Sequence, residues 1–188
     1  GSVRDALLGR LGNDLDFTTP ARPEVVKEIL DEWAETVWDT GIDFGTVSAA
    51  YKGQQIEITT FRSDSYDGQS RNPEVVYGDT LEGDLVRRDF KANAMAIELL
   101  ADASFKFHDP LHGLQDIADR VLDTPDKPEI SFHDDPLRML RAARFASQLE
   151  FRVADRVVEA MRDMAGEIQR ITVERVQVEL CLLYTSPS

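Results

Sequence analysis

Two aspartates one residue apart, Asp14 and Asp16, are the first residues of this sequence whose types and spacing indicate chemistry. They stand in the segment GNDLDFTT, with Leu15 between them and Phe17 after them. Like charges this close repel, so the pair is favoured either at a turn in water or around a bound cation. An isolated pair of this kind is more typical of a turn, because Asp is common there.

The surrounding pattern favours a cation site over a turn. The run DLDFTT alternates like a strand, and residues two apart on a strand face the same side. Glu57 is the best candidate for a third carboxylate on a neighbouring strand, because Ile56 and Ile58 flank it on the opposite face. Carboxylates suit Mg²⁺, and three of them can form a two-metal site. We therefore predict Asp14, Asp16 and Glu57 as catalytic and metal-binding residues.

The first residues of the chain add a possible phosphate contact. Gly1 and Ser2 stand where a short helix is predicted to begin, in GSVRDALLGR. Free backbone N–H groups and a hydroxyl at the start of a helix bind phosphate well. A triphosphate held there would lie beside the predicted metals.

Composition limits the partners. The chain has 35 Asp and Glu against 21 Lys and Arg, a net charge of −14. Such a balance argues against broad, non-specific clamping of nucleic acid and leaves room for divalent cations and a local basic patch. The single cysteine, Cys181, cannot form an internal disulfide, which fits a reducing cytoplasm. No apolar run approaches the roughly 20 residues of a membrane span, so no membrane partner is expected.

A helix start with acidic residues, Asp134-Asp135-Pro136, has two interpretations. It is typical of an ordinary start, with Asp134 as the N-cap and the proline at the first position. It also places Asp135 near a row of basic side chains that could meet phosphates, although such a row alone is more often a solvated face. The row recurs every three residues: Arg138, Arg141 and Arg144.

The segment HDPLH looks superficially like a metal cluster. Pro110 breaks the helix that would align His108 with His112, so we do not predict zinc there. Cys181 lacks a basic or histidine-rich neighbourhood, so nothing marks it as a nucleophile.

Hydrophobic periodicity predicts strands and helices first and helices alone after about Pro128. This order predicts an α+β fold, a small mixed-sheet head followed by an all-helical region. The predicted elements are a helix over 23–36 extending towards Val37, a hairpin turning at Lys52-Gly53, a loop over 63–84, a helix over 87–100, a strand over 104–107, and helices over 136–149, 153–165 and 173–183.

Four segments resemble, in order and spacing, the bacterial tRNA nucleotidyltransferases, which are the CCA-adding enzymes of the poly(A) polymerase-like superfamily. They are GSVRDALLGRLGNDLDFTT, RRDFKANAMA, DPLHGLQDI and DDPLRMLRAARF. Each is moderately specific alone, and four in the right order make a strong signal. The resemblance runs from Gly1 to about Leu180 and implies that the DPLHGLQD segment is a hinge between head and neck.

The resemblance assigns roles to residues. It matches Asp14, Asp16 and Glu57 to the metal-binding carboxylates, with Mg²⁺ as cofactor. It implies a triphosphate-side motif, a motif for ribose and nucleotide recognition, and a pair that reads the base of the incoming CTP or ATP. With the arginine row included, the nucleotide-binding residues are Gly1, Ser2, Arg4, Arg87, Arg88, Asp89, Asn93, Asp135, Arg138, Arg141 and Arg144.

Base reading by Asp135 and Arg138 is chemically sound. Asp accepts from an exocyclic amine, and Arg donates through a fixed fork. Cytosine and adenine both carry an amine beside a ring-nitrogen acceptor, whereas uracil and guanine present the opposite pattern. One such pair accepts C and A and rejects U and G without a template. The resemblance further implies that Arg175 and Glu179 prop the helix that carries this pair.

The implied function is template-independent addition of CMP and AMP to the 3′ end of tRNA by two-metal nucleotidyl transfer. The partners would be the tRNA 3′ end, CTP and ATP, with no protein partner evident. Two alternatives stay open: a bacterial poly(A) polymerase built on the same head, or an inactive nucleotide- or RNA-binding fragment.

The resemblance also sets the expected domains: a nucleotidyltransferase head over 1–126 without its first strand, a helical neck over 127–181, and a disordered or foreign tail over 182–188. The chain opens at GSVRD without Met and with one Gly before Ser2 where the family usually has two, so we expect a fragment truncated at both ends. Two other positions depart from the family. Lys91-Ala92 stands where the family commonly has Thr followed by a branched apolar residue, and Asp134 stands where it commonly has Glu.

Overall fold

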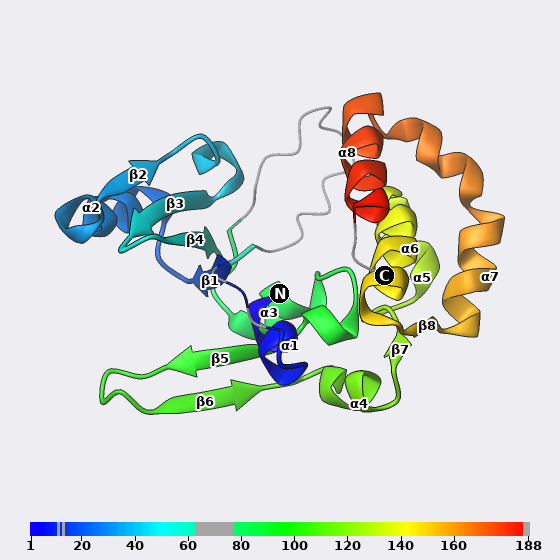
Figure 1. Cartoon of the computed structure of the whole chain (residues 1–188), viewed down its shortest axis with the longest axis horizontal. Coiled ribbons are helices and arrows are strands. Elements are labelled where there is room, and N and C mark those ends of the chain that lie inside the picture. Colours follow the sequence, from blue (N-terminus) through cyan, green and yellow to red (C-terminus); the bar gives the residue numbers. More distant parts are fainter. Residues whose placement is uncertain (11, 13, 63–76, 186–188) are drawn as a thin grey trace. The chain divides into compact units, whose positions relative to one another are not determined.

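The computed structural model describes residues 1–10, 12, 14–62 and 77–185, and it divides into two compact units, Gly1–Arg87 and Arg88–Ser188 (Figure 1). The elements of the first unit are α1 (Ser2–Leu7), β1 (Asp14–Thr19), α2 (Pro23–Trp33), β2 (Thr36–Trp38), the 3₁₀ helix η1 (Ile42–Phe44), β3 (Thr46–Tyr51), β4 (Gln54–Thr60) and α3 (Leu81–Val86).

The first unit is built around a mixed sheet. Within the described residues this sheet has four strands in the order β1-β4-β3-β2, with β1 parallel to β4 and the other pairs antiparallel. The hairpin predicted at Lys52-Gly53 is confirmed. Both turn residues have positive φ, 49° and 77°, which is the conformation of a two-residue turn whose twist matches the strands.

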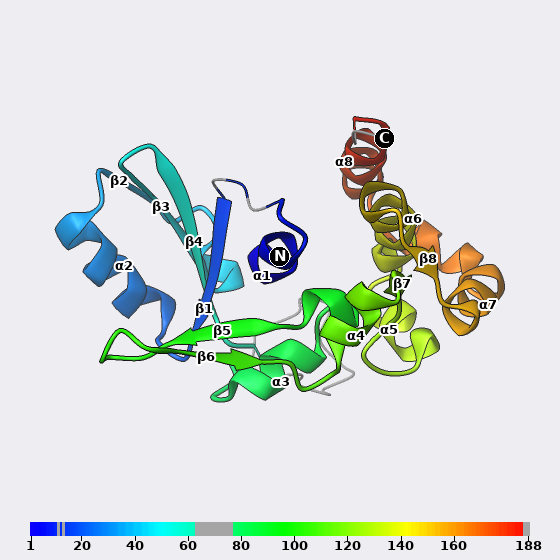
Figure 2. The same cartoon turned by 60° about the horizontal axis from the view of Figure 1, so that its bottom comes forward.

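Helix α2 covers one face of this sheet, and in Figure 2 α1 lies on the other side of it. Val26 and Leu30 of α2 form a buried cluster with Val47 and Ala49 of β3. Because side chains alternate along a strand, Ser48, between Val47 and Ala49, points to the opposite face. By the same alternation and register, Asp16 of β1 and Glu57 of β4 share that opposite face.

The predicted helix over 23–36 is too long. Helix α2 ends at Trp33, and Val37, which fitted the helical spacing, lies in β2 opposite Ala49 of β3. Val37 packs against the cluster under α2, so strand pairing and burial decide its conformation. The predicted loop over 63–84 is also wrong at its end, because α3 begins at Leu81, where Thr80 Oγ1 accepts a hydrogen bond from the Gly83 N–H. Residues 63–76 lie outside the described part of the chain.

The second unit combines short strand pairs with helices. Its elements are the 3₁₀ helix η2 (Lys91–Asn93), β5 (Ala96–Leu99), β6 (Phe105–His108), α4 (Gly113–Ala118), β7 (Val121–Leu122), α5 (Pro128–Asp134), α6 (Leu137–Leu149), β8 (Arg152–Val153), α7 (Asp155–Asp163), the 3₁₀ helix η3 (Ala165–Arg170) and α8 (Val173–Tyr184). The helices predicted over 136–149, 153–165 and 173–183 correspond to α6, α7 and α8.

The helix predicted over 87–100 is wrong, because that segment contains only one short 3₁₀ turn, η2, followed by the strand β5. Strand β5 pairs antiparallel with β6, the strand predicted near SFKF, and this pairing places Ile97 opposite Phe107. No helix-breaking residue stands in this segment, so its local sequence favours a helix. Pairing with β6 outweighs that preference and makes the segment a strand. The pair β7 and β8 was not predicted, since strands of two residues leave no periodic signal.

A separate core holds the helical part together. Phe132 of α5, Met139 of α6, and Val157 and Ala160 of α7 form its buried cluster. Helix α8 continues to Tyr184, so the expectation of disorder is wrong for residues 182–184, whereas a foreign origin of the tail stays a hypothesis. Residues 186–188 lie outside the described part. The helix gains one closing contact from Thr185 Oγ1, which donates to the Cys181 carbonyl.

The α+β prediction is confirmed: a small mixed sheet comes first and a mainly helical region follows. In the described part of the chain, no helix combines the length and apolar character that crossing a bilayer requires.

Candidate active site

Asp16 and Glu57 lie side by side on the open face of the sheet. The parallel register of β1 and β4 pairs Asp16 with Glu57, and neighbouring strands are about 4.8 Å apart. Both residues are exposed. Together with Leu15 and Gln55 they line a depression of about 180 Å³. The structure thus places these two predicted carboxylates on one surface hollow.

Asp14 belongs to the same strand, at the register position opposite Gln55. Its side chain lies outside the described part, so the convergence of three carboxylates stays a prediction. Among the described residues, no group of three His, Cys, Asp or Glu is placed to hold a metal ion. Two neighbouring carboxylates without a cationic partner repel each other, and a bound cation relieves that repulsion.

The start of α1 is tied to the strand that carries Asp16. The Asp16 N–H donates to Ser2 Oγ at 3.0 Å, and Gly1 is the N-cap of α1. Arg4 is buried, and its Nε and Nη2 donate to the two carboxylate oxygens of Asp5 at 2.8 and 2.9 Å. The guanidinium of Arg4 is thus already engaged by a carboxylate within the chain, and a phosphate contact from Gly1, Ser2 or Arg4 stays a prediction.

Asp89 is the centre of a buried polar network in the second unit. Arg141 donates to Asp89 Oδ2 from Nε at 2.9 Å and from Nη2 at 2.6 Å. Asn93 Nδ2 and the Phe90 N–H donate to Asp89 Oδ1 at 2.8 and 2.9 Å. Burial works to raise the pKa of Asp89, but the charge of Arg141 and these hydrogen bonds outweigh it, so the pKa lies below the usual 3.8.

Asp135 and Arg138, the predicted base-reading pair, both have partners within the chain. Asp135 Oδ1 accepts from the Leu137 N–H at 3.2 Å, and Oδ2 accepts from Arg175 Nη2 at 2.9 Å. Arg138 Nη1 donates to Ser131 Oγ at 2.8 Å. The expectation that Asp134 caps this helix is wrong: Asp134 is the last residue of α5, and Asp135 supplies the side-chain oxygen at the start of α6.

The arginine row on α6 does not form an open basic surface. Arg144 is buried, its Nε donates to Glu179 Oε1 at 2.5 Å, and its guanidinium lies 4.2 Å above the Phe145 ring. Nucleotide binding by Arg144 stays a prediction; in this structure its Nε points into an ion pair with α8. Arg141 is likewise neutralised by Asp89.

Helix α8 supports α6 as the resemblance implied. Glu179 contacts Arg144, and Arg175 contacts Asp135, so two ion pairs join α8 to the region that carries the predicted base-reading pair. Arg87 and Arg88 are both half-buried, and nucleotide recognition by them stays a prediction.

Asp116, in the DPLHGLQD segment, was not predicted as a site residue. Its Oδ2 is buried and has no hydrogen-bond partner in the described part of the chain. Burial is the main cause that raises its pKa to about 6, with Lys91 acting against the shift. Lys91 donates instead to Asp123 at 2.7 Å. An aspartate in the middle of a short helix is a weak signal for such a site, since most are solvated.

His108 and Asp109 both have partners within the chain. Nε2 of His108 lies 2.8 Å from Glu98 Oε2 across the β5–β6 pair. Asp109 accepts hydrogen bonds from the N–H groups of Gly113 and Leu114 at the start of α4. The rejection of zinc in this segment stays a prediction.

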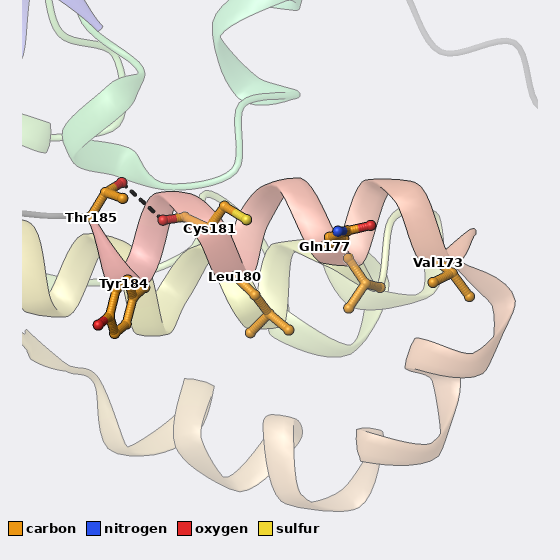
Figure 3. Close-up of a pocket in the computed structure, with 7 residues that line it drawn as sticks. Val173, Gln177, Leu180, Cys181, Tyr184 and Thr185 are labelled. Carbon is orange, nitrogen blue, oxygen red and sulfur yellow. Dashed lines mark hydrogen bonds between the residues drawn. The ribbon is translucent and has the colours of Figure 1, made fainter.

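A larger hollow of about 410 Å³ follows one side of α8 (Figure 3). Figure 3 shows Leu180 and Tyr184 pointing to the same side of the helix. The residues that line this larger hollow include no ionisable group other than Cys181 and Tyr184. The hollow therefore lacks the chemistry of the one lined by Asp16 and Glu57. The lining residues are Val173, Val176, Gln177, Leu180, Cys181, Tyr184 and Thr185.

The fold is a small mixed sheet followed by helices, which is that of an α+β protein. Two adjacent parallel strands of the sheet carry acidic residues at the same register, and these residues form an acidic site on the surface. The model of the poly A polymerase head domain matches residues 1–123, and a second model, described as a probable RNA and SrmB-binding site of polymerase A, matches residues 150–188. The chain belongs to the poly A polymerase head-domain family.

Two curated relatives share the name CCA-adding enzyme. The chain is 40% identical over 188 residues to a CCA-adding enzyme of Lactobacillus helveticus and 40% identical over 189 residues to one of Listeria monocytogenes, in each case over 100% of this chain. These alignments cover 45% and 46% of the relatives. The chain therefore spans about half the length of the curated relatives it matches.

Solved structures agree with this family. The crystal structure of the Bacillus stearothermophilus CCA-adding enzyme in complex with CTP matches with a TM-score of 0.85 and 37% identity, over 100% of this chain and 43% of that one. A tRNA nucleotidyltransferase complexed with a primer tRNA and an incoming ATP analog matches with a TM-score of 0.79 and 30% identity, over 97% of this chain and 50% of that one.

Proposed function

We propose that this chain is the catalytic part of a nucleotidyltransferase that adds CMP and AMP to the 3′ end of tRNA without a template. The observation that carries the proposal is the juxtaposition of Asp16 and Glu57 on exposed, parallel, neighbouring strands. The names of the relatives and the CTP, ATP-analog and tRNA complexes among similar structures support the substrates. Their greater length makes the activity of the whole protein part of the proposal.

Divalent cations fit the donor set of this hollow. Asp16 and Glu57 offer oxygen ligands, and Mg²⁺ prefers carboxylate oxygens together with water and phosphate. We propose that Asp14, Asp16 and Glu57 hold Mg²⁺. When bound, Mg²⁺ supplies positive charge that acidifies an attacking hydroxyl and neutralises a departing pyrophosphate.

The other residues bind and orient the substrates in this proposal. Ser2, fixed against the Asp16 backbone at 3.0 Å, is placed near the carboxylates to meet a triphosphate oxygen. Asp135 and Arg138 read the incoming base at the start of α6. The ion pair between Arg175 and Asp135 holds this acceptor in place before the nucleotide arrives, which reduces the entropy lost on binding.

The finer assignments form part of the same proposal. We retain a head over 1–126, a neck over 127–181, and a cytoplasmic site of action. Asp89 and Asn93 act through the buried network that joins their segment to α6, so their role is to position that segment and not to present free donors or acceptors.

An incorporation assay tests the function. A tRNA transcript lacking its terminal CCA is incubated with labelled CTP and ATP and Mg²⁺, and the products are sequenced at their 3′ ends. We expect a defined CCA end that needs both nucleotides. A long homopolymer made from ATP alone would indicate poly(A) synthesis. Calorimetric binding of CTP and ATP without any incorporation would indicate a binding fragment, and either result would overturn the proposal.

A further inference from the structure

Gln55 lines the same hollow as the two carboxylates. It lies on β4 two residues before Glu57, so the two side chains share one face of the strand. Gln55 is exposed, and the parallel register places it opposite Asp14 on β1. Its position is therefore that of a fourth polar residue at the site, and no role is assigned to it by the motifs above.

Gln55 supplies a chemical group that the carboxylates cannot. Ionised Asp and Glu side chains only accept hydrogen bonds, whereas the Gln amide has two N–H donors. Among the residues that line the hollow, all within the described part of the chain, Gln55 is the one with a donor side chain. No described residue hydrogen-bonds to its amide, so the donor is available to a ligand.

The charge of the hollow selects the ligand. A phosphate oxygen can approach Asp16 and Glu57 only where a bound cation offsets their charge, whereas a neutral hydroxyl can contact a carboxylate and Gln55 directly. A hydroxyl can donate its proton towards a carboxylate and accept a hydrogen bond from an amide at the same time. The volume, about 180 Å³, is below the roughly 300 Å³ at which pockets for whole small molecules begin, so it suits a single sugar.

We infer that Gln55 donates a hydrogen bond to a hydroxyl of the terminal ribose of the accepting RNA. This inference rests on the proposed function and adds a residue for the recognition of the acceptor end. Gln55 is thereby a substrate-binding residue at the reacting end of the RNA, and the incoming nucleotide does not depend on it.

The inference is tested by removing the Gln55 side chain and the terminal hydroxyls of the RNA, separately and together, and comparing the RNA affinities. Fluorescence anisotropy measures the affinity for a short RNA hairpin that ends either in an ordinary ribose or in a 2′,3′-dideoxyribose, in Mg²⁺ and without nucleotide. For the wild-type chain we expect the dideoxy end to bind more weakly. In Gln55→Ala that ratio should fall by about fivefold, the usual size of one hydrogen bond. RNAs lacking only the 2′ or only the 3′ hydroxyl identify which one is bound.

Two further variants make the result specific. Gln54→Ala removes the neighbouring exposed glutamine, which lies opposite Tyr51 and on the other face of β4, and should keep the wild-type ratio. Gln55→Glu keeps the size but lacks the donor, and should lose the ratio as Gln55→Ala does. An unchanged ratio in both Gln55 variants overturns the inference alone. A wild-type chain that ignores the terminal hydroxyls overturns it together with the acceptor site of the proposed function.

Discussion

Arg141 donates two hydrogen bonds to the Asp89 carboxylate, at 2.9 and 2.6 Å, and thereby joins the RRDFKANAMA segment to helix α6. The neighbouring residues reinforce this connection, because the rings of Phe90 and Phe145 meet edge to face at 5.9 Å. Two segments that are distant in the sequence are thus held together, and both contain residues predicted to contact the nucleotide.

Breaking this pair should destabilise the second unit. Arg141→Ala leaves the buried Asp89 without its cationic partner, and we expect a loss of about 3 kcal/mol in the free energy of unfolding at pH 7. Urea denaturation measures it. Because the folded pKa of Asp89 lies below its usual 3.8, the pair stabilises above that pH, and the difference should shrink as the pH falls through the folded pKa.

The control for this experiment is Arg152→Ala, which removes an exposed arginine of β8. Its unfolding free energy should stay within about 0.5 kcal/mol of wild type. Equal losses in both variants would show that the charge of the chain matters and the Asp89 contact does not.

The ion pair between Arg144 and Glu179 should behave as a coupled unit. Both side chains are buried, so Arg144→Met or Glu179→Met alone leaves an unpaired charge and should cost about 3 kcal/mol. The double variant removes both charges and should lose much less than the sum. Additive losses in urea denaturation would mean that the two side chains stabilise the helices independently.

Replacing Asp116 by a neutral residue should make the protein more stable than wild type at pH 7. Its folded pKa of about 6 exceeds the usual 3.8, so ionising Asp116 in the folded state opposes folding and stability falls as the pH rises from about 4 to 6. Asp116→Asn should therefore gain about 1 kcal/mol at pH 7, after allowance for partial solvent screening, and nothing near pH 4. Thermal unfolding from pH 4 to 8 measures this gain. A gain at pH 4 equal to that at pH 7 would contradict the assignment.

Gly113 should not tolerate a side chain. A Cβ there would lie 2.2 Å from the Lys91 carbonyl oxygen, a backbone atom that cannot move without shifting η2. Gly113→Ala should cost about 3 kcal/mol or more in unfolding free energy. Gly166→Ala is the matched control, because a Cβ at Gly166 has nothing within 4 Å. A neutral Gly113→Ala would show that α4 and η2 are not packed this closely.

Metal binding at the carboxylates should be visible without turnover. Mg²⁺ should raise the melting temperature of the wild-type chain, because it binds the folded state and relieves the repulsion between Asp16 and Glu57. Asp16→Asn and Glu57→Gln should lose this shift but keep the fold. Glu24→Gln, an exposed change on α2, should keep both. A shift that survives in Asp16→Asn would place the cation elsewhere.

Under the proposed function, the same carboxylates should decide activity. Asp14→Ala or Asp16→Ala should abolish nucleotide incorporation and leave the circular dichroism spectrum unchanged, because the backbone pairing of β1 with β4 does not depend on either carboxylate. Retained incorporation in either variant would refute the assignment of that residue.

Local signals were sufficient where chain neighbours set the structure. The alternation of DLDFTT and QQIEITTFR predicted two strands, and the Lys52-Gly53 turn predicted the hairpin, since strand period and turn conformation depend on adjacent residues. They were insufficient for Val37 and for residues 96–99, whose spacing fits a helix but whose partners, β3 and β6, lie elsewhere in the chain.

The sequence by itself determined which residues carry charge, how far apart Asp14 and Asp16 stand, and which strands present Asp16 and Glu57, because side-chain identity and strand alternation are local properties. Only the tertiary structure decided that Glu57 lies at the register of Asp16, that Gln55 shares their hollow, and that Arg141 and Arg144 are bound by Asp89 and Glu179. Strand register and ion pairing depend on which distant segments pack against each other. That packing is determined by the burial of side chains from the whole chain, so it cannot be deduced from adjacent residues.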